Sequence, residues 1–200
     1  MKIVIATRNE HKTKEIKQLF NKYDLDLISL SEIDPNNKIP DVDEIGKTLI
    51  ENAYLKAEEI EKKIGLPCLS DDSGLEVDYL NGDPGIYSAR YAGEGCSFQN
   101  NIDKLLLKLE GVPKILRKAS FKTVLAYVDR SLKFDVLGEV RGYISTNRKG
   151  KKGFGYDPIF VVNELNRTYA SLSSLEKSKI SHRSRAVKNI LVKFRKFDII

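Results

Sequence analysis

The strongest constraint on the fold is a pair of β-rich segments in the middle of the chain. Residues 119–128 and 132–144 are rich in Val, Tyr, Phe and Thr, and only the short polar stretch 129–131 separates them. Segments of this composition joined by so short a turn predict a long antiparallel hairpin. Any fold of this chain must therefore contain a sheet with two long neighbouring antiparallel strands.

Strands and helices alternate before this hairpin. Residues 2–6 are apolar throughout, as in a strand buried on both faces, and the apolar residues of 49–64 recur at helical spacing. The expected strands are 2–6, 25–30, 68–70, 119–128, 132–144 and 159–162, with a further element at 75–77. The expected helices lie around 16–23, 49–64, 102–109, 173–176 and 186–194. Residues 31–45 are polar, and we expect Pro35 and Pro40 to prevent any helix there. The pattern predicts an α/β fold with a mixed sheet split between two lobes, in one domain spanning residues 1–200.

Composition excludes some classes of protein. The chain is 41% hydrophobic and 31% charged, and no apolar run approaches the roughly 20 residues that span a bilayer. Its two cysteines, Cys68 and Cys96, lack the spacing of a metal site. We therefore expect a reduced, cytoplasmic setting, with Cys68 as a small core residue.

Charge is distributed unevenly along the chain. Residues 1–100 hold 12 Lys and Arg against 19 Asp and Glu, whereas residues 101–200 hold 22 against 9. The first half thus has acids available for a metal, and the second half has cations available for phosphates. The basic excess could instead be a solvated surface, or the surface of a nucleotide- or RNA-binding module without chemistry.

Two adjacent acids are the most informative local feature. Asp71 and Asp72 follow the apolar run 66–69 and precede Ser73. Carboxylates placed side by side at the end of a predicted strand repel each other unless a cation lies nearby, and a divalent metal would supply one. An Asx-type turn made by Asp72 or Ser73 is the structural alternative.

Two further segments could complete a phosphate and metal site. Thr7, Asn9 and Lys12 lie where a strand gives way to a helix, a place where free N–H groups bind phosphate, although Thr7 or Asn9 could simply cap the helix. Glu44 precedes the helix that leads back to the acid pair, so both could meet at one end of the sheet. A single metal held by one or two carboxylates suits Mg²⁺. For Asp41 and Asp43 a solvated loop is the better interpretation.

The basic half contains two candidate ligand segments. In the run 152–158, two glycines flank Phe154 and an Asp-Pro pair follows, which would let the backbone approach a flat ligand; a tight turn with core aromatics is the alternative. Lys177 lies shortly before His182 and Arg183, which begin the last predicted helix. These cations suggest contact with a phosphate or a polar base edge, whereas a lone histidine is more often structural.

Taken together, these segments resemble the inosine/xanthosine triphosphate pyrophosphatase family, in order and over nearly the whole chain. The matching stretches are Thr7–Asn9 with Lys12 and Glu15, Ile50–Ala53, Asp71–Leu75, Pro84–Arg90, Phe154–Phe160, Glu176–Ser178 and Ser181–Arg183. The resemblance implies an elongated two-lobed α/β protein with a central cleft, Mg²⁺ dependence and a homodimer. It also implies hydrolysis of ITP, dITP and XTP to the monophosphate and pyrophosphate, with no nucleic-acid or membrane partner.

The resemblance assigns roles to residues as well. Glu44 and Asp72 would hold the metal, Asp72 would also accept a proton, and Ser73 would contact the substrate. The residues that would bind the triphosphate are Thr7, Arg8, Asn9, Glu10, His11 and Lys12, and those that would enclose base and sugar are Phe154, Gly155, Tyr156, Asp157, Lys177, His182 and Arg183. His11 stands where many members of the family have glycine.

Overall fold

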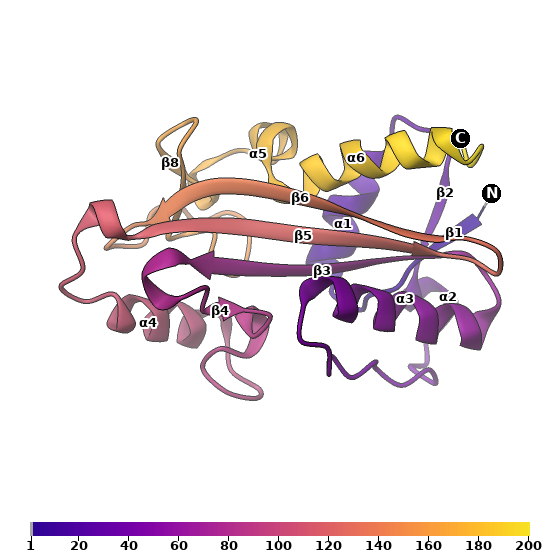
Figure 1. The fold of residues 1–200 in the computed structure, drawn as a ribbon, viewed down its shortest axis with the longest axis horizontal. Coiled ribbons are helices and arrows are strands. Elements are labelled where there is room, and N and C mark those ends of the chain that lie inside the picture. Colours follow the sequence, from indigo (N-terminus) through magenta and orange to yellow (C-terminus); the bar gives the residue numbers. More distant parts are fainter. Residues whose placement is uncertain (1) are drawn as a thin grey trace. The chain divides into compact units, whose positions relative to one another are not determined.

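The computed structural model describes residues 2–200, which form a mixed α/β fold (Figure 1). Within these residues one sheet has eight strands: β1 (Lys2–Ile5), β2 (Asp26–Ser29), β3 (Cys68–Val77), β4 (Pro84–Gly85), β5 (Lys118–Val128), β6 (Lys133–Ile144), β7 (Phe160–Val162) and β8 (Arg167–Thr168). The helices are α1 (Glu10–Phe20), α2 (Leu30–Ile33), α3 (Leu49–Ile64), α4 (Phe98–Lys108), α5 (Ser174–Ile180) and α6 (His182–Lys196). The strand order is β2-β1-β3-β5-β6-β7-β8, and β4 pairs with β3. The predicted α/β class and the long β5–β6 hairpin are confirmed.

The chain divides into two compact units. Unit 1 contains the described residues up to Asp72 together with Thr123–Gly138 and Arg183–Ile200, and unit 2 contains Ser73–Lys122 and Glu139–His182. Strands β3, β5 and β6 each contribute residues to both units. None of the helices in residues 2–200 is long and apolar enough to cross a membrane.

Unit 1 has a hydrophobic core on each face of its strands. β1 pairs in parallel with β2 and β3, and its side chains alternate between the two faces. Ile3 and Ile5 pack with α1 and α6, whereas Val4 packs with α2 and α3. Figure 1 accordingly shows α6 and α3 on opposite sides of these strands. Cys68 belongs to the second core and is fully buried, as predicted.

Unit 2 has one large core and one charged sheet face. Leu75, Phe121 and Val140 from three strands pack with the apolar side of α4, on which Ile102 and Leu105 are buried. The opposite face of β5 and β6 carries alternating charged and polar side chains, as expected for an antiparallel sheet with one face in solvent.

The prediction of a short strand at 68–70 and a separate element at 75–77 is wrong, because β3 is one continuous ten-residue strand. It lies between β1 and β5 in the sheet, and Leu75 also pairs with Gly85 of β4. β1 pairs with β3 at Cys68 and Leu69, so Asp71 and Asp72 follow the part of the strand that β1 holds and lie inside β3, not at its end. The Asx-type turn considered as an alternative does not form there.

The expectation of no helix within 31–45 is also wrong at its start. Ser29 and Glu32 form a capping box around the single-turn helix α2, which ends two residues before Pro35. The prolines exclude a longer helix but leave this turn untouched. The two-residue strand β8 was not predicted, and so short an element leaves no readable period in the sequence.

Candidate functional site

Thr7 and Asn9, two of the predicted phosphate ligands, have local structural roles at the start of α1. Asn9 is the N-cap: its side-chain oxygen accepts a hydrogen bond from the Lys12 N–H at 3.2 Å. The Thr7 hydroxyl oxygen accepts one from the Asn9 N–H, also at 3.2 Å. The capping interpretation therefore holds for Asn9. Phosphate binding by these residues stays a prediction.

Asp71 is the buried centre of a charge network in unit 1. It is fully buried, and its carboxylate accepts from Lys12 Nζ at 2.8 Å and from Arg183 Nε at 2.7 Å. Arg183 is itself buried and also pairs with Glu15. Burial would raise the pKa of Asp71, but the charges of Arg183 and Lys12 outweigh it and hold that pKa well below its ordinary value. The two cations therefore favour the ionised form of Asp71.

Asp72 meets a different set of charges. Lys56 Nζ, on α3, lies 2.5 Å from an Asp72 carboxylate oxygen and 2.9 Å from Glu44 Oε1, and it also donates to the Asp71 carbonyl at 2.9 Å. Burial raises the pKa of Asp72 above its ordinary value, against the opposing charges of Lys56 and Lys12. Burial would lower the pKa of Lys56, but Asp72 and Glu44 raise it. Asp72 thus has the raised basicity that suits a proton acceptor.

The pleat of β3 explains why two adjacent acids differ so much. Successive side chains of a strand point to opposite faces of the sheet. Asp71 accordingly meets Lys12 and Arg183 from the helices α1 and α6, whereas Asp72 meets Lys56 from α3. The repulsion expected from the sequence is therefore relieved separately on each face.

Lys56 is a functional candidate that the sequence reading missed. It is 8% exposed and lies on the buried side of α3, with Ala53 and Ala57 as its neighbours on the helix. A lysine within the apolar stripe of an amphipathic helix must find a partner, because buried lysines are almost always paired. The position of Lys56 in this stripe could be read from the sequence, and it indicated that the lysine has an acidic partner.

The residues around Lys56 fit a small oxygen-ligated cation. Glu44 and Asp72 both contact one ammonium nitrogen, so their carboxylates converge on a single positive charge. Groups of three or more His, Cys, Asp or Glu able to hold a metal are absent from residues 2–200. Two carboxylates with room for substrate oxygens match Mg²⁺ better than a closed protein cage.

Arg8, Glu10 and His11 are the other residues near the start of α1 that were predicted to bind the triphosphate. Arg8 bonds to Asp34 at 2.7 Å and to the Ile39 carbonyl at 2.7 Å, and Glu10 accepts from Ser31 at 2.8 Å. His11 is exposed. The partners of Arg8 and Glu10 lie in α2 and the segment that follows it, outside the cluster around Lys56. Asp41 and Asp43 are exposed, as the solvated-loop interpretation predicts.

In unit 2, Asp157 organises the glycine-rich segment. Its carboxylate accepts from Lys177 Nζ at 2.6 Å and from the Phe154 N–H at 3.0 Å. Gly153 has a φ of +75°, and a Cβ there would come within 1.8 Å of the Asp157 carboxylate, so this position requires glycine. Lys177 Nζ also lies 5.2 Å from the centre of the Phe154 ring.

The other predicted base-binding residues of unit 2 fall into two groups. Tyr156 and His182 are buried: the Tyr156 hydroxyl donates to the Ser88 carbonyl at 2.9 Å, and the His182 ring stacks on Phe121 at 4.7 Å. Gly155, with a φ of +58°, and Ser73 are partly exposed. Tyr156 is therefore a core aromatic residue, as the tight-turn alternative expects, whereas Phe154 is half-buried beside Lys177.

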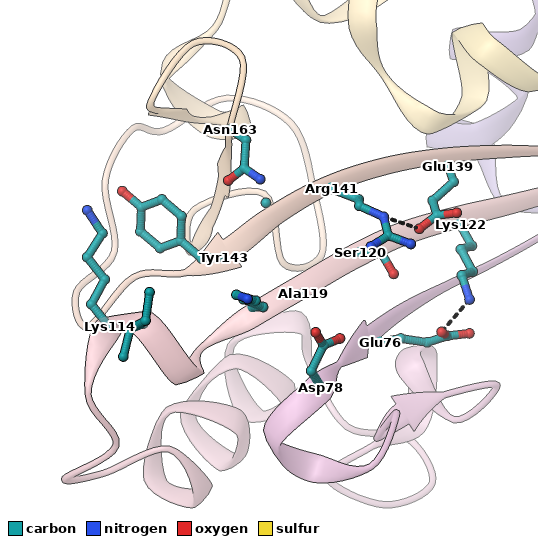
Figure 2. A pocket seen from close by; sticks show the side chains of 13 residues that line it. Glu76, Asp78, Lys114, Ala119, Ser120, Lys122, Glu139, Arg141, Tyr143 and Asn163 are labelled. Carbon is teal, nitrogen blue, oxygen red and sulfur yellow. Dashed lines mark hydrogen bonds and ion pairs between the residues drawn. The ribbon is translucent and has the colours of Figure 1, made fainter.

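A groove of about 700 Å³ lies on the charged sheet face of unit 2 (Figure 2). Lys122 pairs with Glu76 at 2.5 Å, and Arg141 pairs with Glu139 at 3.2 Å. Tyr143 lies at one end of the groove, and the centre of its ring is 4.5 Å from Lys114 Nζ. The residues lining it include none of those predicted to bind substrate or metal.

The chain is similar over nearly its whole length to curated proteins and to solved structures. A dITP/XTP pyrophosphatase of Thermoanaerobacter pseudethanolicus is 45% identical over 96% of this chain and 98% of its own, and one of Bacillus licheniformis is 47% identical over 94% and 95%. The structure of the Staphylococcus aureus Ham1 protein matches with a TM-score of 0.85 and 43% identity, covering 99% of this chain and 100% of that one. Residues 3–193 match the model of the Ham1 family, and the chain therefore belongs to the Ham1 family.

Proposed function

We propose that this protein hydrolyses the non-standard purine nucleoside triphosphates ITP, dITP and XTP to the monophosphate and pyrophosphate, and so removes them from the nucleotide pool. The relatives at 45% and 47% identity are dITP/XTP pyrophosphatases, and the chain is a hydrolase of their family. The observation that carries the proposal is the convergence of the Glu44 and Asp72 carboxylates on one positive charge. Carboxylates in a site for a polyanion are unfavourable unless a metal joins them.

Each residue of unit 1 has a chemical task in this reaction. Glu44 and Asp72 would hold Mg²⁺, which when bound neutralises phosphate charge and lowers the pKa of water. Asp72 takes the proton from the water that attacks the α-phosphorus. The bond from that phosphorus to the bridging oxygen breaks, and pyrophosphate leaves. Lys12 stabilises the negative charge that builds on the phosphoryl oxygens, and Thr7–Lys12 bind the triphosphate.

The base and sugar contacts are assigned to unit 2. We propose that Phe154, Gly155, Tyr156 and Asp157, with Lys177 and His182, enclose the base, and that Ser73 contacts the substrate. The Lys177–Asp157 ion pair beside the Phe154 ring supports this, because it presents a fixed donor next to an aromatic face. Arg183 was expected to join them. Its contacts with Asp71 and Glu15 favour a role in holding the network of unit 1.

Pyrophosphate release from ITP, dITP, XTP, GTP and ATP, with and without Mg²⁺, tests the substrate class. Hydrolysis in ¹⁸O-labelled water tests the position of attack, because attack at the α-phosphorus leaves the label in the monophosphate. Label in pyrophosphate, or equal rates for ATP and ITP, would overturn the proposal. A salt-sensitive gel shift with RNA and no turnover would favour a binding module instead.

We further propose that residues 1–200 act as a single domain in the cytoplasm. Because β3, β5 and β6 each contribute to both units, neither unit can be cut from the chain without breaking three strands. Cys68 and Cys96 are both free, which suits a reducing compartment. Burial raises the pKa of the Cys68 thiol to about 12, so we expect a thiol reagent to modify Cys96 alone until the protein unfolds.

We also propose that the protein is a homodimer. The charged groove of unit 2 supports this, since Glu76, Asp78 and Glu139 share it with Lys118 and Arg141, and a face with both signs of charge can complement a second copy of itself. Light scattering should then report about twice the chain mass of 22.7 kDa. Arg141→Glu should shift the protein toward monomer, and a monomer at all concentrations of the unmodified protein would contradict the proposal.

A further inference from the structure

We propose that Asn52 is a positioning residue, which fixes the proposed metal ligand Glu44 by binding the backbone of its loop. Residues 34–48, between α2 and α3, contain no helix or strand, so Glu44 takes no placement from regular structure. Asn52 Oδ1 accepts a hydrogen bond from the Gly46 N–H at 2.8 Å, two residues beyond Glu44. The inference rests on the proposed Mg²⁺-dependent function.

The loop is seated closely against the first turn of α3. A Cβ on Gly46 would lie 2.6 Å from Asn52 Oδ1 and 2.7 Å from Glu51 Cβ, distances that permit only glycine without a shift of the loop. The Lys47 N–H donates to Glu51 Oε2 at 2.5 Å, which provides a second attachment. Side chains at the start of α3 thus hold two consecutive loop N–H groups.

The same face of α3 carries Lys56, one turn beyond Asn52. Lys56 Nζ binds the Glu44 carboxylate at 2.9 Å, while Asn52 holds the backbone that presents it. An ammonium group competes with a metal ion for Glu44. A neutral amide does not, so Asn52 can hold the loop whether or not a metal is bound.

Only one side of the Asn52 amide is hydrogen-bonded within the described residues. Asn52 is fully buried, and within residues 2–200 its Nδ2 has no hydrogen-bond partner. A leucine of the same branched shape would bury no unpaired side-chain donor, but it would leave the Gly46 N–H without this acceptor. The bond to Gly46 is the feature that only an acceptor such as asparagine provides.

Asn101 offers a matched control in unit 2. It is 2% exposed and occupies the fourth residue of α4, as Asn52 does in α3. Its Oδ1 accepts from the loop N–H of Ala92 at 2.7 Å. Replacing either asparagine by leucine removes a bond to a loop N–H, and Asn101→Leu also removes the bonds to the Ala89 carbonyl and to Cys96. Only Asn52→Leu releases the loop of a proposed metal ligand.

The experiment compares the full-length Asn52→Leu and Asn101→Leu proteins with the unmodified one. Mn²⁺, which takes the same oxygen ligands as Mg²⁺, is titrated without nucleotide and the free ion is measured by electron paramagnetic resonance. Partners that orient a metal ligand typically contribute 10- to 100-fold in affinity. We therefore expect Asn52→Leu to weaken Mn²⁺ binding at least 10-fold, to speed hydrogen exchange at the Gly46 amide, and to regain most of its kcat at saturating Mg²⁺. Asn101→Leu should bind Mn²⁺ within twofold of the unmodified protein.

Gly46→Ala tests the same contact from the loop side and covers the case in which Asn52→Leu fails to fold. It should weaken Mn²⁺ binding too, and the double variant should be no weaker than the worse single one, because both break one contact. Mn²⁺ affinity within twofold of the unmodified protein in either variant, with the Gly46 amide exchanging faster, would overturn the inference. Failure of the proposed function would look different: the unmodified protein itself would release no pyrophosphate when Mg²⁺ is added.

Discussion

Lys56→Met isolates the contribution of one buried cation to both stability and metal binding. The ammonium group touches Asp72, Glu44 and the Asp71 carbonyl, and methionine keeps much of the side-chain volume without the charge. Two carboxylates would then face each other with no cation between them. The variant should therefore be less stable than the unmodified protein, and more dependent on added metal.

The size of the loss follows from burial. Removing one partner of a buried ion pair costs about 3–5 kcal/mol. We expect a loss at the lower end of this range for two reasons. The Glu44 side chain is 27% exposed, so water screens part of its charge. Burial already raises the pKa of Asp72, so this carboxylate can bind a proton when the ammonium group is removed. A loss of about 3 kcal/mol lowers Tm by roughly 6–12 °C in a protein of this length.

Calorimetry in EDTA and in Mg²⁺ measures both effects. Mg²⁺ should raise the Tm of Lys56→Met more than that of the unmodified protein, because a bound cation replaces the missing charge. Lys17→Met is the control: Lys17 also lies 2.5 Å from a carboxylate, that of Glu32, but both side chains are at least one-third exposed. Such a pair contributes about 0–1 kcal/mol. Equal losses for the two variants, or no recovery of Lys56→Met in Mg²⁺, would refute the reasoning.

The remaining predictions concern the acids and the phosphate ligand. Asp72→Asn should keep the fold and lose at least about 10³-fold in turnover of ITP, since the base and a metal ligand disappear together; near-normal turnover would contradict the assignment. Lys12→Ala should raise KM for ITP, whereas Lys14→Ala, on an exposed position, should not. Asp71→Asn should destabilise at pH 7. The depressed pKa of Asp71 stabilises the fold above about pH 4 and that contribution is lost on acidification, so urea titrations should show the difference shrinking below pH 4.

Local signals in the sequence predicted the helices well. Ser173 and Glu176 form the expected capping box, and Ser97 caps α4. The apolar stripe of residues 49–64 coincides with α3. Each of these features depends on residues within one or two helical turns of each other, so the local sequence alone is sufficient to predict it.

Long-range partners were not predictable in the same way. Arg183 and Asp71 are 112 residues apart, and nothing near either residue identifies the other. Arg183 was assigned to the substrate on the resemblance, because an arginine at a helix start suits a phosphate or a base. The fold brings α6 next to β3, where the buried guanidinium of Arg183 is paired with the carboxylates of Asp71 and Glu15, and contact of Arg183 with the substrate stays a prediction. The continuity of β3 was missed for a related reason: it depends on the strands that lie beside β3 in the sheet, and these are distant in sequence.

The continuous strand is also what separates the chemistry of the two acids. A turn at Asp71 and Asp72 would have left both carboxylates near one another and equally solvated. In an extended strand they point to opposite faces, so that each makes ion pairs with different cations, although the charge of Lys12 acts on both. Asp71 is fixed as an anion that orders Lys12 and Arg183, and the pKa of Asp72 is raised beside Lys56 and Glu44. Adjacent titratable groups whose pKa values are pushed apart can take different roles, one structural and one as a base, and here the pleat of a single strand is sufficient to produce that division.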